Sequence, residues 1–492
     1  MNRSITISKG EAVLDSLVRS GIVISAPCGG RGICGKCRVI LREGTVRLNE
    51  STETPKPGDF FPACLGIAVT DITIELPEES AGEYIIEKTR AKKAGKKAIR
   101  AGLGLDIGTT TVQAELICLD TGESLETLSV LNAQRSFGAD VMSRINAARQ
   151  GKTAELFTAI NKQTEDILLY FINGWNLSGI ELCTVSGNTT MLHLFAGVDP
   201  GSMGELPFAP VFLENRRFEG KELSLSAGKI TLLPGISAFV GADIVSGLAF
   251  LDILNSKEDS LFVDIGTNGE MALWRKAEQR FLCCSTAAGP CFEGAEISCG
   301  MTAGPGAINR INQDLSFSTI GNVPPRGICG TALIDVIAVM KQLDAIEETG
   351  ALADKYLETG FPIAEGIAVS QRDIRQFQLA KSAILSGISV LCQKAGLKAK
   401  DVDAVYIAGG LGFYLNLKNA AAAGLLPPEF AIRPAGKKQT AICGNTSLMG
   451  AVKSLTDDNF LQRCREIAAK SDHVELGQDS NFVEAFADNM YF

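Results

Sequence analysis

The chain has 492 residues, of which 46% are hydrophobic and 21% charged, so it is long enough for several domains with sizeable cores. Its 47 Lys and Arg against 56 Asp and Glu give a formal net charge of −9, which excludes the basic composition typical of nucleic-acid-binding proteins. The start of the chain has no apolar run typical of a signal peptide, and no apolar stretch of about 18 residues occurs. We therefore expect a cytoplasmic protein that does not enter a membrane.

Cysteine, and not histidine, is the residue type available for a metal site. The chain has 14 cysteines and two histidines, His193 and His473. In a reducing cytoplasm, cysteines serve as metal ligands or buried thiols more often than as disulfides.

Four cysteines lie near the N-terminus in the pattern C-x5-C-x2-C, followed by one distant cysteine. They are Cys28, Cys34, Cys37 and Cys64. The glycine-rich string APCGGRGICGKC can wrap a cluster and direct backbone N–H groups at its sulfurs. A four-cysteine zinc site usually pairs two short Cys-x2–4-Cys arms, which this pattern lacks. The spacing therefore predicts a [2Fe–2S] cluster bound by these four thiolates, with a first gap one residue longer than in plant-type ferredoxins.

The segments around these cysteines predict a small α+β domain. The string AVLDSLVRSG has helical spacing and ends at Gly21, while 38–44, 45–48 and 72–76 have the pattern of short strands. Residues 3–77 thus resemble the β-grasp [2Fe–2S] ferredoxin domain, and we assign 1–77 to it. Such domains open with a two-stranded hairpin, whereas only residues 4–7 precede the helix here.

Residues 78–101 are acidic at first and then basic, with little apolar pattern. We predict a solvated, charged linker. As an alternative, it is a tether whose lysines steer an acidic partner to the cluster domain. The lysines in question are Lys92, Lys93, Lys96 and Lys97.

After the linker, one motif occurs twice: LGLDIGTTTVQAEL at 103–116 and LFVDIGTNGEMAL at 261–273. Each copy reads as a strand, a tight turn and a second strand. Such a turn places a carboxylate beside backbone N–H groups and hydroxyls, which suits phosphate and Mg²⁺. The candidate residues of the two turns are Asp106, Gly108, Thr109 and Thr110, and Asp264, Gly266, Thr267 and Asn268.

A third motif, AVYIAGGLG at 404–412, is a strand that ends in Gly409, Gly410 and Gly412 and allows a nucleoside to approach closely. With it, the chain resembles the actin, sugar-kinase and heat-shock-chaperone ATPase superfamily. This resemblance implies a duplicated α/β fold, with halves at 102–258 and 259–492. SGNTTM at 186–191 and GADI at 241–244 either line the same cleft or are ordinary turns.

A [2Fe–2S] domain joined to this ATPase fold resembles the reductive activators of corrinoid-dependent enzymes. Further strings fit that family, among them FGADVMSRI at 137–145 and STAAGPCFEGAEISCGM at 285–301. The resemblance implies ATP-dependent transfer of one electron to an inactive Co(II) corrinoid protein, which restores Co(I). It also implies a low-potential donor such as a ferredoxin and a homodimer. Asp106 and Asp264 would organise Mg²⁺ and the attacking water.

Two alternatives stay open from the sequence alone. The client could be another metalloenzyme, such as a radical dehydratase, and a second metal centre would then draw on Cys283, Cys284, Cys291 and Cys299. The other alternative is a small-molecule kinase, which needs a carboxylate base near a substrate hydroxyl. The carboxylates available for that role are Asp140, Asp243, Glu293 and Glu296.

Overall fold

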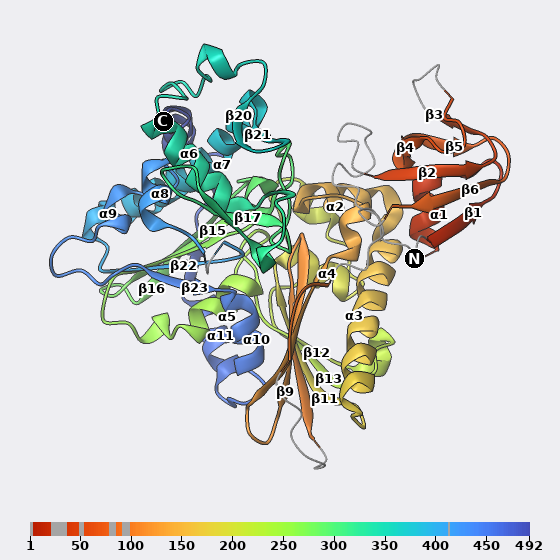
Figure 1. The fold of residues 1–492 in the computed structure, drawn as a ribbon. Helices are drawn as coiled ribbons and strands as arrows, with labels where there is room; N and C mark the ends of the chain where they lie inside the picture. Colours follow the sequence, from red (N-terminus) through yellow and green to blue (C-terminus); the bar gives the residue numbers. More distant parts are fainter. Residues whose placement is uncertain (1–2, 21–36, 49–53, 78–84, 91–98, 412–413) are drawn as a thin grey trace.

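The computed structural model describes residues 3–20, 37–48, 54–77, 85–90, 99–411 and 414–492. Three main sheets organise these residues, of four, seven and six strands (Figure 1). The mixed α/β architecture confirms the predicted fold class, with a small N-terminal part followed by two related α/β halves.

The N-terminal part is an antiparallel sheet of order β1-β6-β2-β4 with one helix against it. Its elements are β1 (Arg3–Ile7), α1 (Val13–Arg19), β2 (Arg38–Glu43), β3 (Val46–Leu48), β4 (Phe60–Pro62), β5 (Gly66–Ala68) and β6 (Ile72–Leu76). β2 and β3 do not form a hairpin, because β3 pairs with β5 in a separate ladder. Between β1 and α1 the chain makes only one isolated bridge, Ala12 with Ile67, in place of a second strand. This part has its own apolar core, which includes Val13, Val39 and Phe61.

The seven-stranded sheet has the order β12-β13-β11-β8-β9-β10-β7. Its strands are β7 (Ile85–Arg90), β8 (Ala101–Ile107), β9 (Thr111–Cys118), β10 (Ser124–Leu131), β11 (Ile180–Gly187), β12 (Arg216–Glu219) and β13 (Ala227–Leu232). β7 corrects the prediction for 78–101, because part of the expected linker pairs antiparallel with β10. The edge of β10 offers unpaired backbone groups, and the six residues of β7 pair with them through their own backbone. Such pairing does not depend on the charge of the side chains.

The six-stranded sheet, of order β23-β22-β14-β15-β16-β24, repeats this arrangement. Its strands are β14 (Ser260–Ile265), β15 (Gly269–Arg275), β16 (Arg280–Thr286), β22 (Ala404–Ala408), β23 (Ala441–Gly444) and β24 (Ser471–His473). In each sheet an antiparallel trio, β8-β9-β10 or β14-β15-β16, is followed on the side of its first member by two parallel strands, β11 and β13 or β22 and β23. The duplication predicted from the two DIGT motifs is therefore a duplication of the sheet itself.

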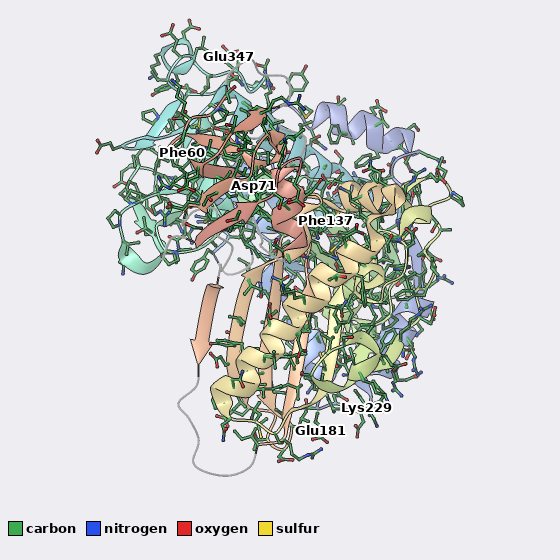
Figure 2. All side chains as sticks on the ribbon, turned by 90° about the vertical axis from the view of Figure 1, so that its right-hand side faces the viewer. Phe60, Asp71, Phe137, Glu181, Lys229 and Glu347 are labelled. Carbon is green, nitrogen blue, oxygen red and sulfur yellow. The ribbon has the colours of Figure 1, made fainter. Side chains whose placement is uncertain are left out.

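Helices and three short ladders cover these sheets. The first half carries α2 (Val141–Ala147), α3 (Thr153–Trp175), α4 (Thr189–Phe195) and α5 (Ala242–Phe250), and the second carries α6 (Gly330–Gln342), α7 (Gln371–Lys394), α8 (Leu417–Ala422), α9 (Pro428–Ala431), α10 (Thr446–Lys453), α11 (Phe460–Ala469) and α12 (Ser480–Asp488). The remaining strands are β17 (Ala307–Ile311), β18 (Phe317–Thr319), β19 (Gly327–Ile328), β20 (Phe361–Ala364) and β21 (Ile367–Val369). Figure 2 shows α3 along the seven-stranded sheet, with Glu181 near one end of it.

Helices α5 and α10 join the two halves. A Cβ on Gly247 of α5 would lie 2.6 Å from Thr446 Oγ1, and a Cβ on Gly450 of α10 would lie 2.6 Å from the Ser246 carbonyl oxygen. The two glycines therefore let the helices cross closely. Because β8 ends near α10, this crossing brings residues of both halves to the carboxyl ends of β8 and β14.

The C-terminal segment packs against α7. The buried amine of Lys381 donates to the carbonyl oxygens of Asn489 (2.6 Å) and Tyr491 (2.5 Å), and the Phe492 ring stacks on Phe377. None of the helices in the described part of the chain is long and apolar enough to cross a membrane.

Candidate functional site

Asp106 and Asp264 stand at equivalent places, one residue before the ends of β8 and β14. Each begins a turn closed by a backbone hydrogen bond: Gly108 N–H to Thr111 O and Gly266 N–H to Asn268 O, both 2.9 Å. Because β8 and β14 both end at the junction of the halves, the turns that follow them lie together, with Thr110 Oγ1 3.3 Å from Thr267 Oγ1. The structure thus brings together the two predicted phosphate turns.

Asp106 is held by α10. Its carboxylate accepts hydrogen bonds from Asn445 Nδ2 at 2.7 Å and from Ser447 Oγ at 2.8 Å. Burial raises the pKa of Asp106, while these two donors lower it. Neither Asn445 nor Ser447 was predicted. The signal that could have found them is the string GNT, which occurs at 187–189 and again at 444–446.

Further carboxylates surround Asp264. Burial, followed by the negative charges of Asp243, Asp106 and Glu293, raises its pKa well above the usual range. Burial and the charge of Asp106 raise the pKa of Asp243, and burial raises that of Glu270. Such a concentration of negative charge favours a bound cation.

The GADI string therefore lines the site, since it supplies Asp243 in the first turn of α5. The SGNTTM string does so as well. Asn188 caps α4 by accepting from the Met191 N–H, and its Nδ2 donates to Thr109 Oγ1 at 3.1 Å.

Arg144 supports the first phosphate turn from within the protein. Its guanidinium is fully buried, and it donates to the carbonyl oxygens of Thr109 and Gly138 (3.1 Å for the latter). Burial lowers its pKa to about 9, and the charges of Asp140 and Glu293 act in the opposite direction. A cation thus lies behind the turn, near the place where an anion would bind.

The glycine motif after β22 also reaches the site. Gly409 has φ +97°, and a Cβ there would lie 2.6 Å from Asp264 Oδ1, so only glycine fits. A Cβ on Gly410 would meet nothing within 4 Å. Gly412 lies outside the described residues.

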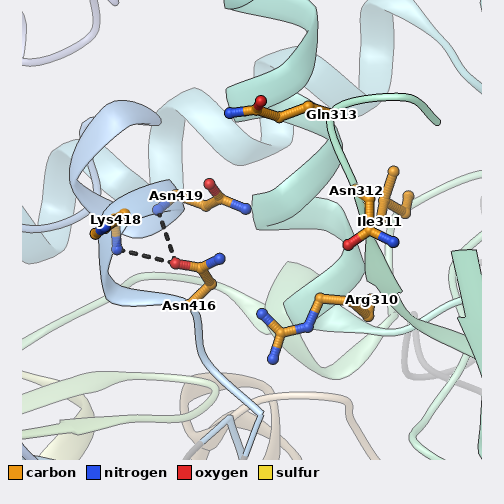
Figure 3. A pocket seen from close by; sticks show the side chains of 7 residues that line it. All are labelled: Arg310, Ile311, Asn312, Gln313, Asn416, Lys418 and Asn419. Carbon is orange, nitrogen blue, oxygen red and sulfur yellow. Dashed lines mark hydrogen bonds between the residues drawn. The ribbon is translucent and has the colours of Figure 1, made fainter. Parts of the chain in front are cut away.

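A pocket of about 400 Å³ opens a few residues further along the chain (Figure 3). It is lined by Arg310, Ile311, Asn312, Gln313, Asn416, Lys418 and Asn419. Asn416 Oδ1 caps α8 by accepting from the N–H groups of Lys418 and Asn419. Arg310 Nη2 donates to the Tyr414 carbonyl oxygen at 3.1 Å, which ties β17 to the chain that follows Gly410.

Two of the four predicted cluster ligands lie within the described residues. The Ala63 N–H donates to the Cys37 carbonyl oxygen at 2.7 Å, and β2 pairs with β4 just beyond, so Cys64 is the residue after the one hydrogen-bonded to Cys37. Neither forms a disulfide. Two thiols at one end of the sheet fit a [2Fe–2S] cluster, whose remaining ligands Cys28 and Cys34 fall outside the described residues.

Three cysteines near the second phosphate turn are buried thiols. Burial raises the pKa of Cys283 to about 12 and those of Cys284 and Cys291 further above their usual range. Within the described ranges, no three His, Cys, Asp or Glu side chains lie close enough together to hold a metal ion directly. Neutral, buried thiols of this kind behave as small apolar residues.

Comparison with known families assigns three successive segments. Residues 1–68 match the 2Fe-2S iron-sulfur cluster binding domain, 101–256 the RACo middle region, and 258–492 the C-terminal domain of RACo, the ASKHA domain.

Proteins of similar sequence or structure match between three quarters and all of this chain. The corrinoid activation enzyme RamQ of Eubacterium limosum is 27% identical, with 100% of this chain and 98% of that protein covered. A [Co(II) methylated amine-specific corrinoid protein] reductase of Methanosarcina barkeri is 29% identical, with 77% and 75% covered. A solved reductive activator for corrinoid, iron-sulfur protein superposes with a TM-score of 0.71 at 26% identity, covering 99% and 96% of the two chains.

Proposed function

The chain resembles the reductive activators of corrinoid-dependent enzymes along nearly its whole length, and on this premise we propose that it is an ATP-dependent reductive activator of a corrinoid protein. It would transfer one electron to the inactive Co(II) corrinoid of a methyltransferase-system protein and so restore Co(I). The observation that carries the proposal is the presence of two sites in one chain. One is the Cys37 and Cys64 pair, and the other is the acidic junction between the phosphate turns.

Energetics explain why both sites are needed. When bound, a [2Fe–2S] cluster supplies single electrons, near −400 mV in plant-type ferredoxins. The Co(II)/Co(I) couple lies lower, and each 100 mV of uphill transfer costs about 2.3 kcal/mol per electron. ATP can supply this free energy only if its binding or hydrolysis changes the affinity for the Co(II) form of the corrinoid protein relative to the affinity for the Co(I) form.

The residues of the junction have distinct roles in this proposal. Asp106 and Asp264 would hold Mg²⁺ through its bound waters and would orient the attacking water, and the ion would supply positive charge beside the phosphates. The hydroxyls of Thr109, Thr110 and Thr267 donate to phosphate oxygens. Phosphoryl transfer depends mainly on positioning and electrostatics, so a histidine base is unnecessary.

The remaining nucleotide contacts follow from the glycines. Gly266 and Asn268 shape the second phosphate turn as Gly108 shapes the first, and the open side of Gly410 admits the ribose. The pocket in Figure 3 would hold the adenine base, with the guanidinium of Arg310 as a stacking surface.

The proposal also names an electron donor, a location and an oligomeric state. A low-potential ferredoxin would reduce the cluster, the protein would work in the cytoplasm, and it would be a homodimer through its ATPase halves. Size-exclusion chromatography with light scattering tests the last point directly.

The experiment that tests the function follows Co(I) formation. The anaerobically purified protein is mixed with a Co(II) corrinoid protein and a low-potential reductant, with ATP, with ADP or without nucleotide. We expect the Co(I) absorbance to appear only with ATP. If no Co(I) forms with several corrinoid proteins despite an intact cluster spectrum, the proposed client is wrong. Phosphorylation of a small-molecule acceptor would indicate a kinase instead.

A further inference from the structure

One carboxylate, that of Glu293, bridges the two phosphate turns. Its Oε2 accepts a hydrogen bond from Thr110 Oγ1 at 2.6 Å and another from the Thr267 hydroxyl. The two hydroxyl oxygens are themselves 3.3 Å apart. The turns of the two halves are therefore joined through a single negatively charged group.

The turn that carries Glu293 is fixed in the core. It is a short 3-10 helix, Pro290–Glu293, bounded by Gly289 and Gly294, both with φ near +80°. Phe292 is buried and packs edge-on against Phe377 of α7, and a Cβ on Gly330 of α6 would clash with its carbonyl. Since this backbone is anchored in the second half, the Glu293 carboxylate leaves the Thr267 hydroxyl by rotation of its own side chain.

The hydroxyls that hold Glu293 are those that would donate to nucleotide phosphates. A hydroxyl has one proton to donate, so it cannot serve the carboxylate and a phosphate oxygen together. Two anions at hydrogen-bond distance in a partly buried site also repel strongly. Phosphate and the Glu293 carboxylate therefore exclude each other from this position.

We propose that Glu293 closes the two phosphate turns on each other in the nucleotide-free protein and is displaced when phosphates bind between Thr110 and Thr267. This inference rests on the proposed function, because it takes the turns to be a nucleotide site. Glu293 thereby lowers nucleotide affinity, most of all without Mg²⁺ to neutralise the anions.

The test is a Glu293→Gln variant, which removes the charge but keeps the shape. Calorimetric titration with ADP, with and without Mg²⁺, should show the variant binding about tenfold more tightly than the wild type without Mg²⁺, and the gain should be smaller with Mg²⁺. Glu296→Gln is the matched control, because Glu296 lies in the same segment and is exposed. Its affinities should equal those of the wild type.

The outcomes separate this inference from the function on which it rests. Unchanged or weaker ADP binding by Glu293→Gln, with normal binding by the wild type, would overturn the inference and leave the nucleotide site in place. A slower single-turnover hydrolysis with unchanged ADP affinity would assign Glu293 to water positioning and overturn it as well. If the wild type binds neither ADP nor ATP, the proposed function itself fails. Glu293→Ala, which should also bind ADP more tightly, serves if the glutamine variant does not fold.

Discussion

At the scale of single residues, Asp264 combines a functional position with a cost to stability. Its carboxyl has a raised pKa because burial and neighbouring carboxylates disfavour its ionised form. The folded protein therefore binds more protons than the unfolded chain between the ordinary pKa of about 3.9 and the raised value. The contribution of Asp264 to the free energy of unfolding is therefore fully present at low pH and is lost as the pH rises through the raised pKa.

This pH dependence predicts the effect of Asp264→Asn on stability. The free energy of unfolding of the nucleotide-free protein should rise by about 1–3 kcal/mol at pH 8, because a repelled, desolvated charge is removed. The gain should shrink as the pH falls towards 4. Urea unfolding at both pH values measures it, and Mg–ATP binding should weaken by at least about tenfold.

Asp166→Asn is the control for this substitution, because Asp166 is exposed on α3. We expect its effect on the unfolding free energy to be within about 0.5 kcal/mol. A destabilising Asp264→Asn, or a gain independent of pH, would contradict the account of the acidic junction.

At the scale of secondary-structure elements, the start of α10 has two roles: Asn445 caps the helix, and Asn445 and Ser447 bind the Asp106 carboxylate. Asn445 Oδ1 accepts from the Leu448 N–H at 2.9 Å, while its Nδ2 donates to Asp106 and to Gln113 Oε1 (3.1 Å). One side chain therefore begins a helix of the second half and contacts two strands of the first.

Asn445→Ala should destabilise the nucleotide-free protein by about 2–4 kcal/mol, since it removes a cap and leaves a buried carboxylate short of a donor. Asn416→Ala is matched to it, because Asn416 also caps a helix, α8, and among the described residues its side chain bonds to the Lys418 and Asn419 N–H groups and to no carboxylate. That variant should lose only about 1 kcal/mol in the same unfolding measurement. Equal losses of unfolding free energy in the two variants would mean that the contact between Asn445 and Asp106 does not stabilise the packing of the two halves.

At the scale of the whole molecule, the N-terminal part and the two α/β halves have separate sheets and separate apolar cores. The N-terminal part contains Cys37 and Cys64, and the α/β halves contain the acidic junction. Separate cores imply that a lost side-chain function in one part leaves the folding of the other intact.

Two variants test this division. Cys64→Ala should lose the visible absorbance of the cluster and all Co(I) formation, while ATP binding stays within about twofold of the wild type. Asp106→Asn should lose ATP-dependent Co(I) formation and keep the cluster spectrum. Cys118→Ser, at the end of β9, is the control and should retain both properties. Loss of both properties in a folded variant would refute the two-part arrangement.

The sequence alone determined the features that depend on local geometry. Both strands that end in Asp-Ile-Gly-Thr form a tight turn here, so the duplication and the fold class could be predicted from two short strings. The thiol spacing around Cys28 to Cys37 likewise pointed to one class of cluster, which the family comparison supports.

Only the tertiary structure decided which distant residues share the junction. Asn445 and Ser447 reach Asp106 because α10 crosses α5, and Glu293 reaches Thr110 because the two sheets face each other. Strand β7 forms within a charged segment because β10 leaves an open edge. Each of these contacts joins residues far apart in the chain, and their interaction energies arise only after the halves pack together, so no local pattern carries them.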